Sequence, residues 1–447
     1  MTRKFARRIF ALPLAAILVS GLGGCGVLGG KDKPDTPTIG NRVPVLSRIE
    51  SGAKVDQALA AVAVVLPPEQ VNTEWAQAGG AASKAYGHLA LSPTPTRAWT
   101  ASIAGASNKR RLAAAPVVAD GKLFAIDTSA EVHAFDAQTG RKIWSRRLEL
   151  DSDLRASAFG GGVSFSGGKL YATNGAGEVV SLDANSGNEL WKVKPAGPLR
   201  GAPTIAFGAV YVMTQDNQIY ALDASDGSPL WNESGSTAQA GVFGVAAPAA
   251  GQGTVVAGYS TGELVAYRYE NGRTLWSDAL ARTSISTQVG TLTDVDADPI
   301  IDSGRVYALG QGGRMAAYEL VTGQRLWELN LAGISTPAVA GEWIFTLTDD
   351  ARLLAIARSN GKIRWITQLR EWKNVKKRRD QIFWTGPVLA GNRLWVANSR
   401  GQLYMVDVAN GSATEFRDLG GGVSLPPLVA NRTLYVLDDD GRISAFR

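Results

Sequence analysis

The sequence predicts an all-β protein built as an eight-bladed propeller, with four antiparallel strands in each blade. Three observations support this fold class. Short runs of Val, Ile, Leu and Tyr lie between turn residues, the 447 residues include 51 glycines and 12 tryptophans, and one phrase recurs along the chain. The phrase "ALDASDGSPLW" ends at Trp231, and its counterparts "SLDANSGNELW" and "AYELVTGQRLW" end at Trp191 and Trp327.

The repeat has the length of one blade. Successive copies are 38 to 51 residues apart, which fits a unit of four short strands. In residues 115–148, four apolar runs are separated by "DG", "DTSA" and "AQTG", each with the chemistry of a tight turn. Gly140 stands where such a turn needs a positive φ. The aromatic residues that close the copies are Trp99, Trp144, Trp191, Trp231, Trp276, Trp327, Trp365 and Phe416.

The two ends of the repeat array predict how the ring closes. After Phe416 the chain supplies only three more strand-like runs, "PPLVA", "TLYVLD" and "RISAFR". The segment "TRAWTASI" around Trp99 is an outer strand with no three strands before it. We therefore predict that it completes the last blade, which leaves eight blades and no open edge between the ends of the array. The closing aromatics should pack between neighbouring blades.

The N-terminus predicts export and a lipid anchor. Arg and Lys residues precede the apolar run "IFALPLAAILV", which is too short to span a membrane, so residues 1–24 are expected to be a signal peptide. The following "LGGC" resembles the lipobox of bacterial lipoproteins, in which the cysteine, here Cys25, becomes the acylated first residue. Gly26 in place of Asp indicates the outer membrane. "ARRIFAL" also faintly resembles a twin-arginine signal, an alternative route of export.

These features divide the chain into three expected parts. Residues 25–93 would hold the acylated cysteine, a polar tether and an extension that includes "QALAAVAVVLPP", and residues 94–447 would form the propeller. Cys25 is the only cysteine, so the protein has no intramolecular disulfide.

Charge argues against a nucleic-acid partner. Four of the 46 basic residues lie in the signal, so the remaining chain is nearly neutral against 40 acidic residues. One basic run, "KNVKKRRD" at residues 373–380, is expected to be a solvated loop, with anionic lipid head groups or an acidic partner as the functional alternatives.

The repeat resembles the tryptophan-docking repeat of the quinoprotein propellers. Two groups share it: pyrroloquinoline-quinone (PQQ)-dependent alcohol dehydrogenases, and the BamB family of lipoproteins in the outer-membrane β-barrel assembly (BAM) complex. The lipobox, "GGVSFSGGKLYA" at residues 161–172 and "LTDVDADPI" at residues 292–300 resemble the second group. That resemblance implies a non-catalytic periplasmic scaffold without a cofactor, which binds BamA, acts with the other BAM lipoproteins and assists the folding and insertion of unfolded outer-membrane proteins.

The resemblance also implies partner-binding residues. In the family, one inter-blade loop carries Asp-x-Asp and the preceding one carries Leu-Arg-Gly. Asp294 and Asp296 match the first motif, although capping of a turn is the alternative for either aspartate. "PLRGAP" at residues 198–203 matches the second motif in wording but lies one blade too early, and "GVFGVAAP" at residues 241–248 stands in register. The expected partner-binding residues are therefore Asp294, Asp296, Phe243 and Val242, with Leu199 and Arg200 as an adjacent patch.

Catalytic alternatives find little support in the residue types. The two histidines, His88 and His133, cannot form a three-histidine zinc site, and no G-x-S-x-G elbow or P-loop is present. "DVDAD" supplies three carboxylates but lacks the glycine of an EF-hand loop, so we predict neither a metal site nor a catalytic residue. A PQQ-dependent oxidoreductase, or a relative that binds quinone without turnover, remains the alternative.

Overall fold

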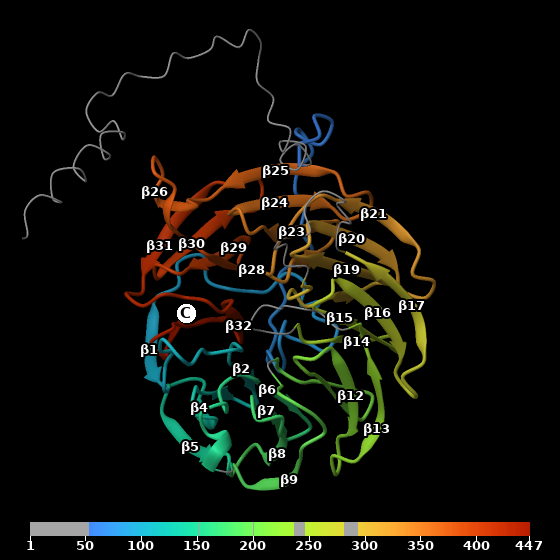
Figure 1. Cartoon of the computed structure of the whole chain (residues 1–447). Helices are drawn as coiled ribbons and strands as arrows, with labels where there is room; N and C mark the ends of the chain where they lie inside the picture. The colour runs from blue at the N-terminus through green and yellow to red at the C-terminus, as the bar shows by residue number, and fades with distance from the viewer. Residues whose placement is uncertain (1–52, 151, 200, 237–245, 281–293) are drawn as a thin grey trace, which may run out of the picture. The chain divides into compact units, whose positions relative to one another are not determined.

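The computed structural model describes residues 53–150, 152–199, 201–236, 246–280 and 294–447. Within these residues, 34 strands form eight four-stranded antiparallel sheets and one two-stranded hairpin (Figure 1). The predicted eight-bladed propeller is confirmed. One 3-10 turn, η2 (Ser152–Leu154), interrupts the strands. No helix in these ranges is long and apolar enough to cross a membrane.

The blades follow the chain in order, and we number them from the first complete sheet. Blade 1 is β2 (Val117–Ala119), β3 (Lys122–Ile126), β4 (Glu131–Asp136) and β5 (Lys142–Arg147). Blade 2 is β6 (Val163–Ser166), β7 (Lys169–Thr173), β8 (Val179–Asp183) and β9 (Glu189–Val193). Blade 3 is β10 (Thr204–Ala206), β11 (Ala209–Met213), β12 (Gln218–Asp223) and β13 (Pro229–Ser234). Blade 4 is β14 (Ala249–Gly251), β15 (Thr254–Gly258), β16 (Glu263–Arg268) and β17 (Thr274–Ala279).

The second half of the ring repeats the same order. Blade 5 is β18 (Ile300–Asp302), β19 (Arg305–Gly310), β20 (Arg314–Glu319) and β21 (Arg325–Leu329). Blade 6 is β22 (Ala338–Ala340), β23 (Trp343–Leu347), β24 (Arg352–Ala357) and β25 (Ile363–Gln368). The hairpin β26 (Trp372–Asn374) and β27 (Arg379–Gln381) leads to blade 7, which is β28 (Trp384–Ala390), β29 (Arg393–Asn398), β30 (Gln402–Asp407) and β31 (Ala413–Asp418).

The ring closes as the ends of the repeat array predicted. Blade 8 consists of β32 (Leu428–Ala430), β33 (Thr433–Leu437), β34 (Arg442–Phe446) and, as its outer strand, β1 (Arg97–Ser102). Trp99 of β1 lies opposite Ala445 of β34. The first and last strands of the ring therefore share one sheet, and their backbone groups are paired inside it.

Each closing tryptophan joins its blade to the next, which confirms that these residues pack between sheets. The indole N–H of Trp231 in blade 3 donates to the Tyr269 carbonyl of blade 4 at 2.8 Å. The indole ring of Trp231 lies over Gly272, whose φ is +72°. A Cβ added at Gly272 would come within 2.7 Å of the indole. The same indole-to-carbonyl bond links Trp99 to Ala137, Trp144 to Ala184, Trp191 to Ala224, Trp276 to Leu320, Trp327 to Arg358 and Trp365 to Val408.

The extension before β1 runs inside the ring, and we call residues 70–91 the strap. Its backbone bonds to the inner strands of the blades, whose edge toward the centre of the ring pairs with no other strand of the sheet (Figure 1). The Trp75 and Val118 backbones bond to each other in blade 1, and Ala250 and Ile301 of blades 4 and 5 donate to Ala82 and Ser83. Along the strap, Asn72 bonds to blade 8, the residues from Trp75 to Ser83 bond to blades 1 to 5, and Leu89 bonds to blade 7.

Three polar residues of the strap are buried: Gln77, Lys84 and His88. Gln77 acts as a strand backbone would, because its side chain donates to the Ile205 carbonyl and accepts from the Ile205 N–H, each at 2.9 Å. Lys84 is 1% exposed and donates to the Thr204 hydroxyl at 3.0 Å. Burial lowers the pKa of Lys84 to about 8, and the nearby Asp298 carboxylate partly opposes this shift. Residues outside the predicted propeller boundary thus contribute to its centre.

Before the strap, the chain lies against blade 6. Val55 pairs with Ile363 of β25, and Asp56 forms an ion pair with Lys362 at 2.8 Å. Leu59, Val64 and Leu66 of the "QALAAVAVVLPP" segment pack against the core of blades 6 and 7.

Candidate partner-binding site

The Asp-Val-Asp segment leads into blade 5, and contacts with neighbouring blades hold it in place. Val295 is buried between blades 4 and 5, and its N–H donates to the Tyr259 carbonyl at 3.2 Å. Asp298 accepts a bond from the Ala247 N–H at 2.8 Å, and its own N–H donates to the Thr336 hydroxyl. Contacts from blades 4 and 6 thus hold this segment in place at the start of blade 5, and Asp298 caps the Ala247 N–H.

The two predicted partner-binding aspartates are more enclosed than the sequence suggested. Asp294 is 2% exposed, and Asp296 is partly buried. Burial and the charges of Asp294 and Asp349 raise the pKa of Asp296 to about 7. The Asp296 Oδ2 atom is buried and makes no hydrogen bond within the described residues. A negative charge is therefore unfavourable at Asp296 in the protein alone.

This electrostatic cost predicts that Asp296→Asn is stabilising at neutral and higher pH. The folded pKa of about 7 lies above the ordinary value of 3.8, so the folded state binds more protons in that window. The contribution of Asp296 to the free energy of unfolding is therefore lost as the pH rises from about 4 to about 7. We expect Asp296→Asn to gain on the order of 2 kcal/mol at pH 8 and little at pH 4. Denaturant unfolding at both pH values measures this, and an equal effect at both would contradict it.

The other predicted partner residues divide into two groups. Leu199 is fully buried in the core of blades 2 and 3 and pairs with Thr214, so its side chain does not reach the surface. Arg200, Val242, Phe243 and Cys25 lie outside the described residues. Direct contact of Leu199 with a partner is thus disfavoured by packing, whereas the roles of the other four remain predictions.

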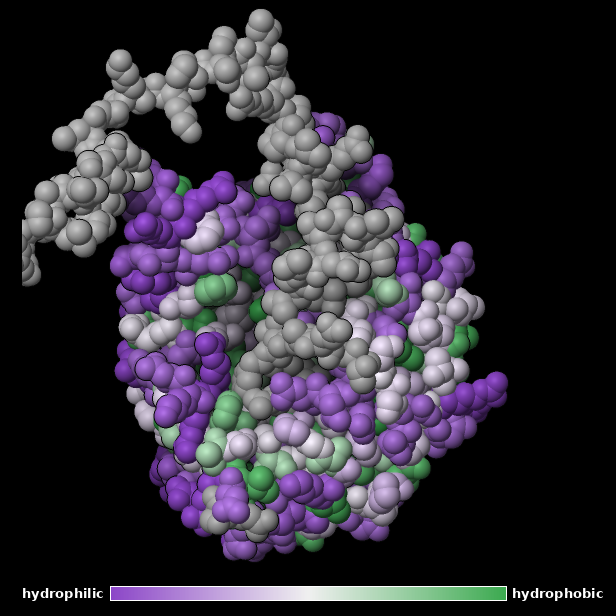
Figure 2. All heavy atoms as spheres, viewed as in Figure 1, coloured by the Kyte–Doolittle hydropathy of each residue, from purple (hydrophilic) through white to green (hydrophobic). Residues whose placement is uncertain are grey.

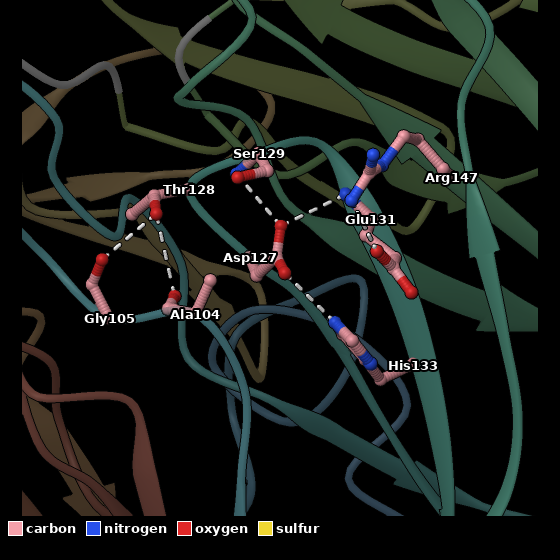
Figure 3. Close-up of polar contacts among 8 residues, drawn as sticks. All are labelled: Ala104, Gly105, Asp127, Thr128, Ser129, Glu131, His133 and Arg147. Atoms are coloured by element: carbon pink, nitrogen blue, oxygen red, sulfur yellow. Dashed lines mark hydrogen bonds and ion pairs between the residues drawn. The ribbon is translucent and has the colours of Figure 1, made fainter.

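One cluster in the described part has the composition of a metal site. Asp127, Glu131 and His133 of blade 1 offer ligand atoms within 4.8 Å of one another (Figure 3). His133 lies in β4, is 4% exposed, and its Nε2 is 3.0 Å from Asp127 Oδ2. Burial opposes ionisation of Asp127, but bonds from His133, Glu131 and Ser129 outweigh it and lower the pKa of Asp127. Glu131 is paired with Arg147.

Comparison between blades shows that this cluster belongs to a repeated turn. Asp127 Oδ1 accepts from the N–H groups of Ser129 and Glu131. In blade 2, Asn174 Oδ1 accepts from Ala176 and Glu178, and in blade 7, Asn398 Oδ1 accepts from Arg400 and Gln402. Asparagine, which carries no charge, makes the same bonds as aspartate here, so in blades 1, 2 and 7 this residue caps the turn between the second and third strands.

The family assignment comes from comparison with known proteins. A family model described as outer membrane protein assembly factor BamB matches residues 87–153, 130–367 and 370–447. The outer membrane protein assembly factor BamB of Salmonella typhimurium is 32% identical over 356 residues, which cover 79% of this chain and 88% of that protein. The chain belongs to the BamB family.

Solved structures show the same fold in BamB proteins and in dehydrogenases. BamB from Moraxella catarrhalis is similar with a TM-score of 0.64 and 18% identity, over 79% of this chain and 99% of that one. Quinohemoprotein alcohol dehydrogenase from Comamonas testosteroni gives a TM-score of 0.67 and 15% identity, over 88% and 82%. At these identities the likeness concerns the fold alone, and the BamB assignment depends on the sequence comparisons.

The contacts between the strap and the propeller were not predicted from the sequence. Lys84 and Asp298 lie far apart in the chain, and neither belongs to the repeat. Gln77 stands in "WAQAGGAASKAYG", a stretch with no strand or helix period. The one usable signal was the apolar and aromatic content of residues 57–91, which exceeds that of an ordinary tether.

Proposed function

We propose that this protein is a non-catalytic scaffold of the outer-membrane β-barrel assembly machinery, held on the periplasmic face of the outer membrane. The signal peptide of residues 1–24 would direct export, and acylation of Cys25 would supply the anchor. Membership of the BamB family is the observation that carries the proposal, since relatives of this chain are named outer membrane protein assembly factors.

The proposed partner is a BamA-like protein, contacted through its periplasmic repeats. The contact surface would include Asp296 together with Val242, Phe243 and Arg200, and Asp294, which is buried in the protein alone, would contribute its charge beside Asp296. Asp296 supports this assignment, because a partner's Lys or Arg beside it would relieve the unfavourable charge described above. The braced backbone around Val295 would hold the loop in one orientation before binding.

The test separates partner binding from folding. We expect the tagged lipoprotein to co-purify from mild detergent with a large outer-membrane barrel protein that carries periplasmic repeats, and with other lipoproteins of the complex. Asp296→Asn should recover at least tenfold less of that protein although it folds at least as stably as wild type. Asp226→Asn, at an exposed turn of blade 3, is the matched control and should retain binding. Failure of wild type to recover such a protein would refute the proposal.

The interior of the ring supports a scaffold over a quinone enzyme. In seven of the eight blades, strap residues bond to the inner strand, so the axial edges that would line a cofactor chamber are occupied there. His88 is also engaged: its Nδ1 donates to the Pro67 carbonyl and its Nε2 accepts from Asn392. A quinone-dependent oxidoreductase is the alternative that the shared fold raises. Quinone absorbance retained by the protein after incubation with quinone and Ca²⁺ would favour that alternative.

Unfolded outer-membrane proteins are the proposed substrates, and the outer strands offer a surface for them. The strands β5, β9, β13, β17 and β21 end their sheets, and each presents one exposed aliphatic side chain just before the closing tryptophan. An extended apolar segment could pair with such an edge by β-augmentation. Insertion kinetics that do not change when Leu190, Leu230 and Leu275 become Asp would contradict this role. The exposed residues are Ile143, Leu190, Leu230, Leu275 and Leu326.

A further inference from the structure

The basic run between blades 6 and 7 is folded, in contrast to the predicted loop. It forms the hairpin β26–β27, in which Trp372 pairs with Gln381 and Asn374 with Arg379. It is the one connection between blades, among those described, that contains strands of its own. We call residues 372–381 the basic hairpin.

Contacts at its base hold the basic hairpin in place. The Arg370 guanidinium donates to the carbonyls of Trp372 and Lys373, at 3.1 and 2.7 Å. Ile382 is 4% exposed, and its N–H donates to the Glu371 carbonyl at 2.8 Å. The Trp384 indole donates to the Arg370 carbonyl. The hairpin is therefore a positioned element of the propeller.

The tip presents positive charge without compensation. Residues 373–380 are all exposed, and they contain five cationic side chains against one carboxylate, Asp380. None of the five forms an ion pair within the described residues, whereas Arg325, Arg358 and Arg393 elsewhere in the ring are paired. The surrounding rim is mainly hydrophilic (Figure 2). The five cations are Lys373, Lys376, Lys377, Arg378 and Arg379.

Two exposed apolar side chains lie in or next to the basic hairpin. Val375 at the tip is 65% exposed, and Phe383 just after the hairpin is 63% exposed. Exposed apolar groups gain nothing from water or from a purely acidic protein surface, so they favour neither a solvated loop nor an acidic protein partner. Cations on both sides of an exposed aliphatic residue in the chain, with an exposed aromatic residue just after the hairpin, suit the interface of an anionic membrane, where charge meets the head groups and apolar groups enter the acyl boundary.

The position of the hairpin also suits a membrane. The described chain begins beside β25, where Asp56 N–H donates to the Ile363 carbonyl, and β25 leads directly into the hairpin. Only 27 residues separate Cys25 from Ala53, which limits the distance from an acylated cysteine to blade 6 to about 100 Å. At such a distance the local concentration of lipid is high, so a weak contact suffices.

We propose that the basic hairpin is a membrane-docking element that binds anionic phospholipid head groups, with Val375 and Phe383 entering the interface. Docking would fix the rotation of the propeller relative to the membrane, which a tether alone leaves free. The proposed lipid anchor would only keep the hairpin near the membrane, and the residues of the hairpin would make the contact with lipid.

The experiment places a reporter at the tip. Because Cys25 is the only cysteine, the full-length double variant Cys25→Ser/Val375→Cys carries one thiol for an environment-sensitive fluorophore and cannot be acylated. The matched control is Cys25→Ser/Val321→Cys, since Val321 is 71% exposed in a turn of blade 5. Both labelled chains are titrated with vesicles of phosphatidylglycerol and phosphatidylcholine, and with phosphatidylcholine alone.

We expect a blue shift at position 375 with the anionic vesicles only, and no shift at position 321. Adding Lys376→Glu, Lys377→Glu and Arg378→Glu should weaken this binding by roughly 100-fold or more, since each cation near an anionic surface contributes about fivefold. Equal responses at the two positions, or binding that survives the charge reversals, would overturn the proposal. A response to soluble polyglutamate but not to vesicles would also overturn it, in favour of an acidic protein. Because no anchor or assembly partner is present, these outcomes are independent of the proposed assembly function.

Discussion

Trp231→Ala should lower the free energy of unfolding by about 3–5 kcal/mol, the range for truncation of a large buried aromatic. Trp231 is 8% exposed, lies between Tyr211 and Tyr267 and covers the backbone of Gly272. The substitution removes the contact that joins blade 3 to blade 4. It also leaves the Tyr269 carbonyl without its indole donor. Denaturant unfolding followed by far-ultraviolet circular dichroism measures the loss.

Two further variants identify the cause. Leu230→Ala changes the neighbouring residue, which is 50% exposed, and should alter stability by less than about 1 kcal/mol. Trp231→Phe keeps an aromatic ring but loses the N–H, and should cost about 1 kcal/mol for the hydrogen bond plus a smaller packing loss. If Leu230→Ala were as damaging as Trp231→Ala, inter-blade packing would not explain the effect.

Gln77→Leu should cost about 2–4 kcal/mol, because it removes the hydrogen-bond partners of one buried backbone N–H and one buried backbone C=O. The Gln77 side chain is 7% exposed and meets the donor and the acceptor of Ile205 in blade 3. Leucine has a similar volume but no polar atom, so the Ile205 N–H and C=O would stay buried and unsatisfied. The same unfolding experiment measures this loss.

The control for Gln77→Leu is Gln57→Leu, an exposed position before the strap, which should have little effect. Gln77→Glu offers a second check. It keeps an acceptor for the Ile205 N–H but sets a carboxylate against the Ile205 carbonyl, so its loss of stability should grow as the pH rises and the group ionises. Equal stability of the Gln77→Leu and Gln57→Leu proteins would show that the hydrogen bonds of the Gln77 side chain contribute nothing to the stability of the ring.

The repeat made the ring predictable. A closing tryptophan and a turn glycine recur in blade after blade, so one local pattern fixes both the four strands and the contact between neighbours. Trp231 over Gly272 repeats as Trp191 over Gly227 and as Trp276 over Gly323. The orphan strand at Trp99 fixed the closure, because three strands at the other end lacked a fourth. These features depend on residue types at set spacings, which the chain displays directly.

The candidate site was only partly predictable. The sequence pointed to Asp294 and Asp296 through a resemblance, but not to their burial, nor to Asp349, whose charge comes from the turn between β23 and β24. Likewise, Asp127 and His133 look like metal ligands by type, and only their bonds to a turn backbone show a structural use.

The sequence by itself determined the eight blades, their order and the way in which the ring closes, because these follow from a repeated local pattern. The tertiary structure alone decided that residues 70–91 lie inside the ring, that Lys84 meets Thr204 and that Gln77 completes the edge of β10. The physical reason is that the strap is held mainly by backbone N–H and C=O groups. Every residue type offers these groups, so they leave no signature in a sequence, and only their arrangement in space shows which of them meet.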